Sequence, residues 1–104
     1  MAELELSGTY TALATPFSAD GSAIDWTSWE KLVAAQIEGG IAGVNPCGST
    51  GESATLPDAE DRELVTRTVA LSRGRIKVIA GTGTNSTAHT IELTRQAFDA
   101  GADA

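Results

Sequence analysis

A short run of hydroxyl-bearing and glycine residues offers the clearest chemistry in this chain of 104 residues. Gly48-Ser49-Thr50-Gly51 comes directly after a predicted strand, where parallel α/β proteins place their ligands. Small residues let a ligand approach the backbone, and two hydroxyls beside free amides favour binding of a carboxylate or an oxyanion. The alternative interpretation is a tight turn in which Ser49 and Thr50 satisfy local backbone groups.

Two phosphate-binding motifs fail on the glycines of this chain. At P-loop spacing from Gly43, Ser49 stands where that motif requires lysine. Gly81-x-Gly83 would begin a dinucleotide fingerprint, but Ser86 replaces the third glycine. The sequence therefore does not support binding of ATP or of a dinucleotide, and a strand-end turn explains the second pair of glycines.

The other reactive side chains indicate no second site. His89 is the only histidine and Cys47 the only cysteine, so we predict neither a disulfide within the chain nor a metal site. We expect His89 at the surface and Cys47 in core or loop packing, because no acid is spaced to orient them as a nucleophilic pair. Trp26 and Trp29, at i and i+3, predict a packing stripe or a subunit contact, and we favour packing in the core.

Alternating strands and helices must position the hydroxyl-rich run. We predict strands over residues 9–17, 41–46 and 76–80, and helices over residues 26–38, 55–75 and 86–100. Asp25 is the expected N-cap of the first helix, Thr55 that of the second, and Asn85 or Ser86 that of the third. Gly39-Gly40 should end the first helix.

This alternation predicts the α/β class, with a parallel sheet and right-handed crossovers. The pattern stops after the third helix, at residues 100–104, so we expect the third strand to lack its next neighbour. An unpaired parallel edge tends to recruit another chain. Residues 1–104 are therefore expected to form a single incomplete domain or part of an obligate assembly.

Composition and charge restrict the partners. The chain is 41% apolar and 20% charged, which excludes the composition of a disordered protein. A net charge of −7 without a basic run argues against a nucleic-acid partner. No apolar run approaches the roughly 18 residues that cross a bilayer, and the N-terminus is acidic, unlike a secretory signal. We expect a cytoplasmic protein with no membrane partner.

Three blocks of sequence together resemble one enzyme family. Thr15-Pro16-Phe17, the run over residues 48–56 and the run over residues 78–88 look like those of the dihydrodipicolinate synthase and N-acetylneuraminate lyase family, in the same order. The resemblance extends from the first strand to the third helix. It implies the first three βα units of a TIM (β/α)8 barrel, a fold of typically about 250 residues. It also implies a pyruvate-dependent Schiff-base lyase that forms a homo-oligomer, a tetramer in the family.

The resemblance assigns roles to the hydroxyl-rich run. Ser49 matches the hydroxyl that links the family's tyrosines in a proton relay, and would be catalytic. Thr50 matches the hydroxyl that binds the pyruvate carboxylate. The resemblance adds four further residues to the predicted substrate site: Gly48, Gly51, Thr15 and Pro16.

The resemblance also shows which part of the chemistry this chain lacks. Neither Lys31 nor Lys77 matches the family's Schiff-base lysine, and Tyr10 does not match its relay tyrosines. The cycle begins when an amine of depressed pKa attacks the keto carbon, so this chain is predicted to be inactive alone. Pyruvate would be held by a lysine outside residues 1–104, and no separate cofactor is expected.

The aldehyde substrate stays open at this stage. Ser49 is typical of neuraminate lyases and 2-keto-3-deoxy sugar acid aldolases, whereas residues 81–88 look more like a synthase, the branch that condenses pyruvate with aspartate semialdehyde for lysine and diaminopimelate biosynthesis. We favour the synthase. Asp58, Asp61 and His89 differ from the residues of lysine-inhibited members, which argues against feedback by lysine. A non-catalytic, self-associating half-barrel is the remaining alternative.

Overall fold

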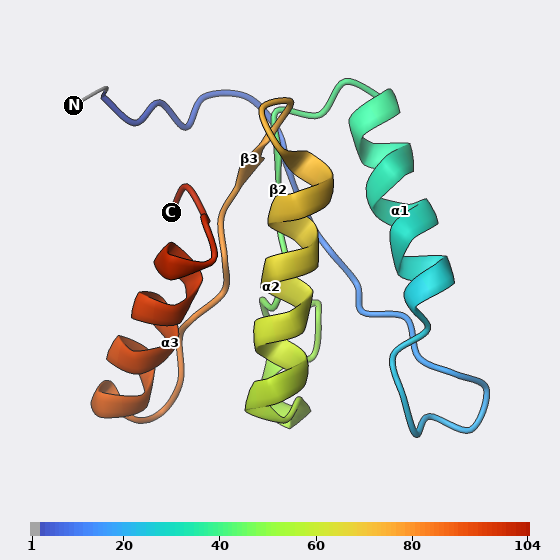
Figure 1. The fold of residues 1–104 in the computed structure, drawn as a ribbon, viewed down its shortest axis with the longest axis vertical. Helices are drawn as coiled ribbons and strands as arrows, with labels where there is room; N and C mark the ends of the chain where they lie inside the picture. Colours follow the sequence, from blue (N-terminus) through green and yellow to red (C-terminus); the bar gives the residue numbers. More distant parts are fainter. Residues whose placement is uncertain (1–2) are drawn as a thin grey trace.

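Three parallel strands alternate with helices in the computed structural model, which describes residues 3–104 (Figure 1). The sheet has the order β1-β2-β3. The elements are β1 (Tyr10–Ala12), α1 (Trp26–Glu38), β2 (Gly43–Asn45), the short 3-10 helix η1 (Ser53–Thr55), α2 (Asp58–Ser72), β3 (Lys77–Val78) and α3 (Thr87–Asp99). The predicted α/β class and the parallel strands are confirmed.

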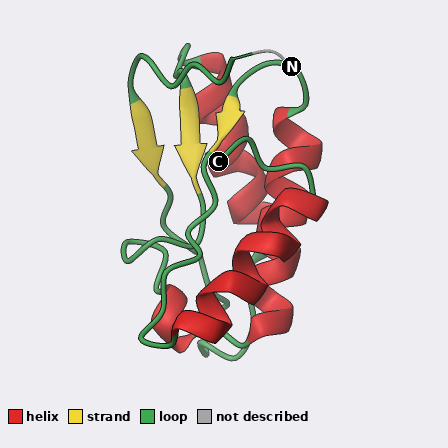
Figure 2. Cartoon of the chain, turned by 90° about the vertical axis from the view of Figure 1, so that its left-hand side faces the viewer, coloured by secondary structure: helices red, strands yellow, loops and turns green. Residues whose placement is uncertain are grey.

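The helices cover one face of the sheet and leave the other free. Figure 2 shows α1, α2 and α3 on the same side of the three strands. Along β1 and just beyond it, Leu13 and Thr15 are buried toward the helices, while Ala12 and Ala14 are exposed. Doubly wound folds place helices on both faces of a sheet, so this one-sided layering is that of a barrel wall.

The hydrophobic core lies between the sheet and the helices. Val44 of β2 and Val33 of α1 are completely buried, and Leu64 of α2 is 2% exposed. Burying each such side chain contributes about 1.5–3 kcal/mol. Trp29 also belongs to this core, and its ring meets that of Trp26 edge to face with centroids 5.6 Å apart. The predicted tryptophan contact is confirmed.

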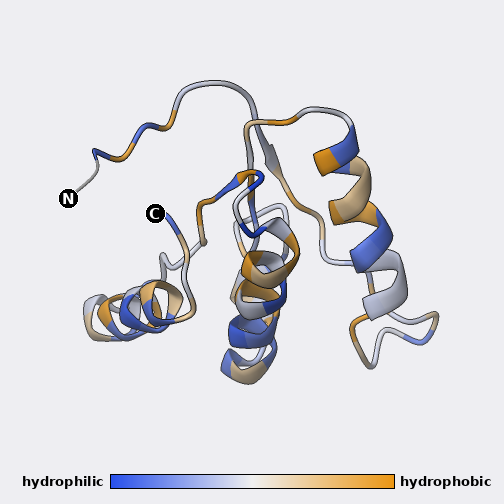
Figure 3. Cartoon of the chain, turned by 45° about the horizontal axis from the view of Figure 1, so that its top comes forward, coloured by the Kyte–Doolittle hydropathy of each residue, from blue (hydrophilic) through white to orange (hydrophobic). Residues whose placement is uncertain are grey.

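Each helix carries hydrophilic as well as hydrophobic residues, as Figure 3 shows. None of the helices within residues 3–104 combines the length and the apolar character needed to cross a membrane. Two of the predicted caps are confirmed: Asp25 accepts a hydrogen bond from the amide of Ser28, and Ser86 accepts one from the amide of His89. Gly39 follows the last residue of α1, as predicted.

Thr55 was predicted to cap α2, and this prediction is wrong. The N-cap residue is Pro57, and Thr55 instead ends η1, where its hydroxyl donates to the carbonyl of Glu52. Proline disfavours the helical region for the residue before it, and Leu56 is accordingly extended, with ψ 134°. The helix therefore starts only after Pro57.

All three strands are shorter than predicted. The ladder of β1 ends with the amide of Leu13, which donates to the carbonyl of Asn45 at 3.0 Å. Beyond Asn45, Pro46 has no amide hydrogen to donate, and Cys47 takes a left-handed φ of 61°, so β2 turns away from β1. Residues 14–17 lose their partner for this reason.

The expected open edge at β3 is partly covered. The amide of Asp103 donates to the carbonyl of Val78 at 2.9 Å, and the amide of Ala80 donates to the carbonyl of Ala104 at 2.8 Å. Asp103 and Ala104 thus lie beside β3 and bond to its backbone and to that of the residues just after it. Within residues 3–104, β1 and β3 are the two edge strands of the sheet, and each has β2 as its ladder partner.

Candidate functional site

The hydroxyl-rich run forms a compact turn at the carboxyl end of β2. The amide of Gly51 donates to the carbonyl of Gly48 at 3.1 Å, and the amide of Glu52 donates to the carbonyl of Ser49 at 3.0 Å. These bonds place Ser49 and Thr50 at the exposed tip. The structure therefore brings the two predicted site residues together, beyond the end of a strand.

The tip residues keep their hydrogen-bond donors free. Within residues 3–104, neither the amides nor the hydroxyls of Ser49 and Thr50 form a hydrogen bond to another residue. Two amides and two hydroxyls thus have no hydrogen-bond partner among the described residues. Several neutral donors on a turn suit a carboxylate or an oxyanion, which accepts hydrogen bonds and donates none.

Left-handed backbone flanks this turn on both sides. Cys47 has φ 61° and Glu52 has φ 62°, and both are residues for which this conformation is unfavourable. Strain of this kind, of the order of 1–3 kcal/mol per residue, persists where the surroundings fix the backbone and is concentrated at functional sites.

Thr15 supports the turn from the segment that follows β1. Its hydroxyl donates to the carbonyl of Gly51 at 2.8 Å, and the residue is 6% exposed. Pro16 is half-buried, and its carbonyl accepts a hydrogen bond from the amide of Asp25 at the start of α1. Thr15 borders the turn through this bond, and the hydrogen bonds of both residues go to other residues of the protein. Their role in binding substrate stays a prediction.

The chain beyond β3 supports the turn from the other side. The amide of Gly81 donates to the carbonyl of Pro46 at 2.9 Å, and a Cβ at Gly81 would clash with the carbonyl of Cys47. The side-chain amide of Asn45 donates to the carbonyl of Ile79 at 2.6 Å. Position 81 therefore requires glycine, because the backbone of Cys47 approaches it closely. The sequence, in which Gly81 and Gly83 look alike, could not show this.

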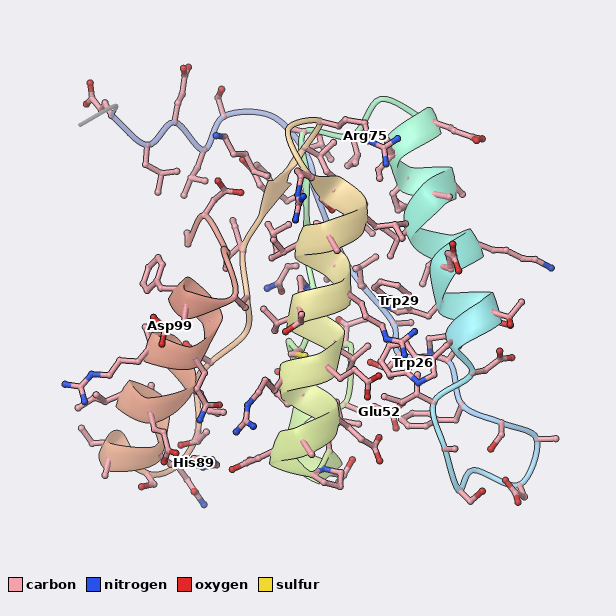
Figure 4. All side chains as sticks on the ribbon, in the orientation of Figure 1. Trp26, Trp29, Glu52, Arg75, His89 and Asp99 are labelled. Carbon is pink, nitrogen blue, oxygen red and sulfur yellow. The ribbon has the colours of Figure 1, made fainter. Side chains whose placement is uncertain are left out.

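A cavity of about 390 Å³ opens beside the turn, between the first turns of α2 and α3. Ser49 lies in its wall, together with Asp58, Asp61 and His89. His89 Nε2 lies 3.0 Å from the nearer carboxylate oxygen of Asp58, which joins the two helices. Figure 4 shows His89 on the first turn of α3. Its side chain is 38% exposed, so the expected surface position is confirmed.

The acidic and thiol groups behind the turn are desolvated. Burial raises the pKa of the Asp61 carboxyl, and the Asp58 carboxylate adds to that rise. Burial, followed by the Asp61 carboxylate, raises the pKa of the Cys47 thiol far above its usual range. Cys47 is 2% exposed and stays a neutral thiol, which confirms the prediction of core packing. No metal-ligand cluster occurs among residues 3–104.

The two lysines and the tyrosine of this chain, which do not match the Schiff-base lysine or the relay tyrosines, lie away from the turn. Lys77 opens β3 at the amino end of the sheet, and its ammonium lies 3.8 Å from the carboxylate of Asp103. Lys31 is exposed on α1. Tyr10 opens β1, and its buried hydroxyl has no hydrogen-bond partner within residues 3–104. Lys77 and Tyr10 thus lie at the opposite end of the sheet from the turn, and Lys31 lies on the exposed surface of the helical layer.

The model of the dihydrodipicolinate synthetase family matches residues 5–104. The chain belongs to this family. It is 55% identical over 102 residues to the 4-hydroxy-tetrahydrodipicolinate synthase of Sorangium cellulosum, covering 98% of this chain and 34% of that protein. It is 54% identical over 99 residues to the enzyme of Stenotrophomonas maltophilia, covering 95% and 33%. The predicted family membership is confirmed.

Solved structures of the dihydrodipicolinate synthetase family show the same arrangement. The Methylacidiphilum fumariolicum enzyme superposes with a TM-score of 0.89 at 46% identity, covering 94% of this chain and 32% of that one. The Acinetobacter baumannii enzyme, described as complexed with pyruvate, gives 0.88 at 43% identity, covering 91% and 32%. The chain thus corresponds to the N-terminal part of a TIM barrel, and it spans about a third of the length of these relatives.

Two residues of this site were missed from the sequence. Asn45 was counted only as part of a strand, although a polar residue at the carboxyl end of a parallel strand is a signal for a site. Asp61 is one of three acidic residues in the first turn of α2, and the positive end of the helix dipole is enough to account for such a cluster. Nothing in the sequence indicated that Asp61 would be 7% exposed behind the turn.

Proposed function

We propose that this chain forms the N-terminal third of a 4-hydroxy-tetrahydrodipicolinate synthase, a lyase that condenses pyruvate with aspartate semialdehyde in lysine and diaminopimelate biosynthesis. The observation that carries the proposal is the turn at the carboxyl end of β2, whose Ser49 and Thr50 offer four free donors. Relatives of that name at 54–55% identity support it. So does a family structure at 43% identity that is described as a pyruvate complex.

Each part of the turn has a task in this proposal. The amides of Ser49 and Thr50, with the Thr50 hydroxyl, bind the pyruvate carboxylate and orient its keto carbon. The Ser49 hydroxyl passes a proton between groups that lie outside this chain. A lysine elsewhere in the barrel supplies the amine that attacks the keto carbon. Residues 1–104 alone are therefore expected to be inactive.

The first test is the intact mass of the native protein. The chain covers 34% of the Sorangium cellulosum relative, so we expect a native mass about three times the 10.7 kDa of residues 1–104. A native mass near 10.7 kDa would contradict the proposal, because no Schiff-base lysine would then be present.

The second test replaces the tip hydroxyls in the full-length protein. We expect Thr50→Ala to raise the KM for pyruvate and Ser49→Ala to lower kcat, each by about 100-fold, as for loss of one transition-state donor. Thr66→Ala is the matched control, because this exposed hydroxyl on α2 bonds only to the carbonyl of Arg62. Unchanged kinetics in both tip variants would contradict the assignment.

Ser49 also fits enzymes that act on a second substrate class, the neuraminate or 2-keto-3-deoxy sugar acids, so a third test concerns the substrate. We expect the full-length protein to consume pyruvate with aspartate semialdehyde and to leave N-acetylmannosamine and glyceraldehyde unused. Turnover with a sugar aldehyde instead would move the assignment to the aldolase branch without changing the role of the turn.

The helix-free face of the sheet favours an alternative of another class, a non-catalytic half-barrel that self-associates. Sedimentation of residues 1–104 distinguishes the two. We expect a monomer or an ill-defined aggregate from a barrel portion, whereas a discrete dimer or tetramer would support the alternative. Tetramer formation by the full-length protein and its cytoplasmic location remain predictions.

A further inference from the structure

The turn that carries Ser49 and Thr50 is held by two side chains, Thr15 from the segment after β1 and Asn45 from the end of β2 itself. We propose that Thr15 and Asn45 are positioning residues, which hold the Gly48–Gly51 turn so that its free donors converge on one carboxylate. This inference rests on the proposed function, and it explains how donors that make no hydrogen bonds of their own keep a fixed direction.

The first of these side chains, Thr15, comes from the segment after β1. The Thr15 hydroxyl donates to the carbonyl of Gly51 at 2.8 Å, and the amide of Gly51 donates to the carbonyl of Gly48 at 3.1 Å. One hydroxyl therefore fixes the peptide that closes the turn. Gly51 is buried and has no side chain to anchor it: a Cβ there would lie 3.0 Å from the carbonyl of Leu13.

The second side chain, Asn45, comes from the end of β2. The Asn45 side chain donates from Nδ2 to the carbonyl of Ile79 at 2.6 Å, which ties it to the chain beyond β3. Its Oδ1 faces Gly48 so closely that a Cβ on that residue would lie 2.7 Å away. Asn45 Oδ1 thus occupies the space that a side chain at position 48 would need, and the Ile79 bond holds Asn45 against the start of the turn.

Fixing both ends of the turn matters because its tip is otherwise unconstrained. Within residues 3–104, Ser49 and Thr50 donate no hydrogen bond and are exposed. Donors that are already aimed at the position of a charge stabilise it without reorganisation when the ligand arrives. A misplacement of about 1 Å costs up to about 100-fold in rate. Thr15 and Asn45 act through the turn and need not touch substrate.

The test uses Thr15→Val and Asn45→Ala in the full-length protein, with kcat, the KM for pyruvate and Tm measured for each. Thr68→Val is the matched control, because this fully buried hydroxyl makes the same kind of bond, 2.7 Å to the carbonyl of Leu64 within α2. We expect Thr15→Val and Asn45→Ala to raise the KM for pyruvate about tenfold. Thr68→Val should lower Tm and leave that KM unchanged.

A conservative variant of Thr15 tests whether its hydroxyl is the group that matters, and two results would overturn the inference. Thr15→Ser keeps the hydroxyl and should restore the KM for pyruvate to within about twofold of the unaltered protein. An unchanged KM in Asn45→Ala, or an equal rise in Thr68→Val, would overturn the inference, even if Thr15→Val does not fold. An unaltered full-length protein that fails to bind pyruvate would instead overturn the proposed function, so the two failures are distinguishable.

Discussion

The turn after β2 is built differently from the turns at the amino end of the sheet. At the amino ends of the strands, left-handed backbone is found at glycines: Gly8, Gly40, Gly74 and Gly101. At the carboxyl end, the turn after β2 is flanked by Cys47 and Glu52 in the same conformation. Glycine adopts this backbone without steric cost, whereas other residues do not.

The hydrogen bonds of the turns also differ between the two ends of the sheet. In the turn between α2 and β3, the guanidinium of Arg75 donates to the carbonyl of Leu71 near the end of α2. The backbone amide of Arg75 donates to the carbonyl of Ser72. Figure 4 shows Arg75 at that end of α2. The tip of the carboxyl-end turn, Ser49 and Thr50, keeps its donors free instead. Strain and free donors together distinguish a turn built for a ligand from turns that only connect elements.

The largest expected effect breaks the carboxyl-end turn outright. Gly81→Ala places a Cβ against the carbonyl of Cys47, where only rigid backbone could give way, so we expect a loss of about 3 kcal/mol in the free energy of unfolding. Gly83→Ala is the control, since its Cβ would meet nothing within 4 Å and should change stability by less than about 0.5 kcal/mol. Urea unfolding measures both, and equal effects would mean that the close approach is not rigid.

These glycines also show how far the sequence carries the prediction. The pattern placed both at the end of a strand, which is right, but it assigned them the same task. Their difference comes from the Cys47 carbonyl, 34 positions away from Gly81, which only the folded sheet brings close. Asn45 was missed for the same reason, because its partner, Ile79, lies on the chain beyond the neighbouring strand.

Signals within a few residues were more reliable. Asp25 and Ser86 cap their helices as predicted, because an N-cap bonds to an amide three positions along the chain. Thr55 shows the limit of that rule: it has the correct residue type, but Pro57 sets the start of α2. The location of Ser49 and Thr50 could be predicted because parallel sheets place functional loops at one edge. The free state of their donors could not.

A medium effect is expected from the buried carboxyl behind the turn. The folded pKa of Asp61 is raised, chiefly by burial, above its ordinary value of about 3.9. The folded state therefore holds this proton more tightly, and stability falls as pH rises through the folded pKa. Asp61→Asn should stabilise the chain at pH 7 and make little difference near pH 3, where the carboxyl is protonated in both states.

Asp20, in the exposed turn before α1, should change the free energy of unfolding with pH in the direction opposite to Asp61. Hydrogen bonds from the Ser22 amide and hydroxyl, and then from the Ser18 hydroxyl, lower the pKa of Asp20 to about 2. Its contribution is present above the ordinary carboxyl pKa and is lost as pH falls toward 2. Asp20→Asn should thus destabilise the chain at pH 7. Unfolding curves at pH 3, 5 and 7 compare the two variants, and the same sign for both would refute the assigned environments.

The smallest expected effect comes from relieving the backbone strain at Glu52. Glu52→Gly relieves a left-handed residue whose side chain makes no capping bond, so we expect a gain of about 0.5 kcal/mol, the steric relief less the added chain entropy. Gly74→Ala makes the reverse change in the connecting turn, where a Cβ would meet nothing within 4 Å, and should cost about 1 kcal/mol. If Glu52→Gly also raises the KM for pyruvate in the full-length protein, the strained residue contributes to holding the turn. A stability gain with unchanged KM would show that the Thr15 and Asn45 bonds hold it without Glu52.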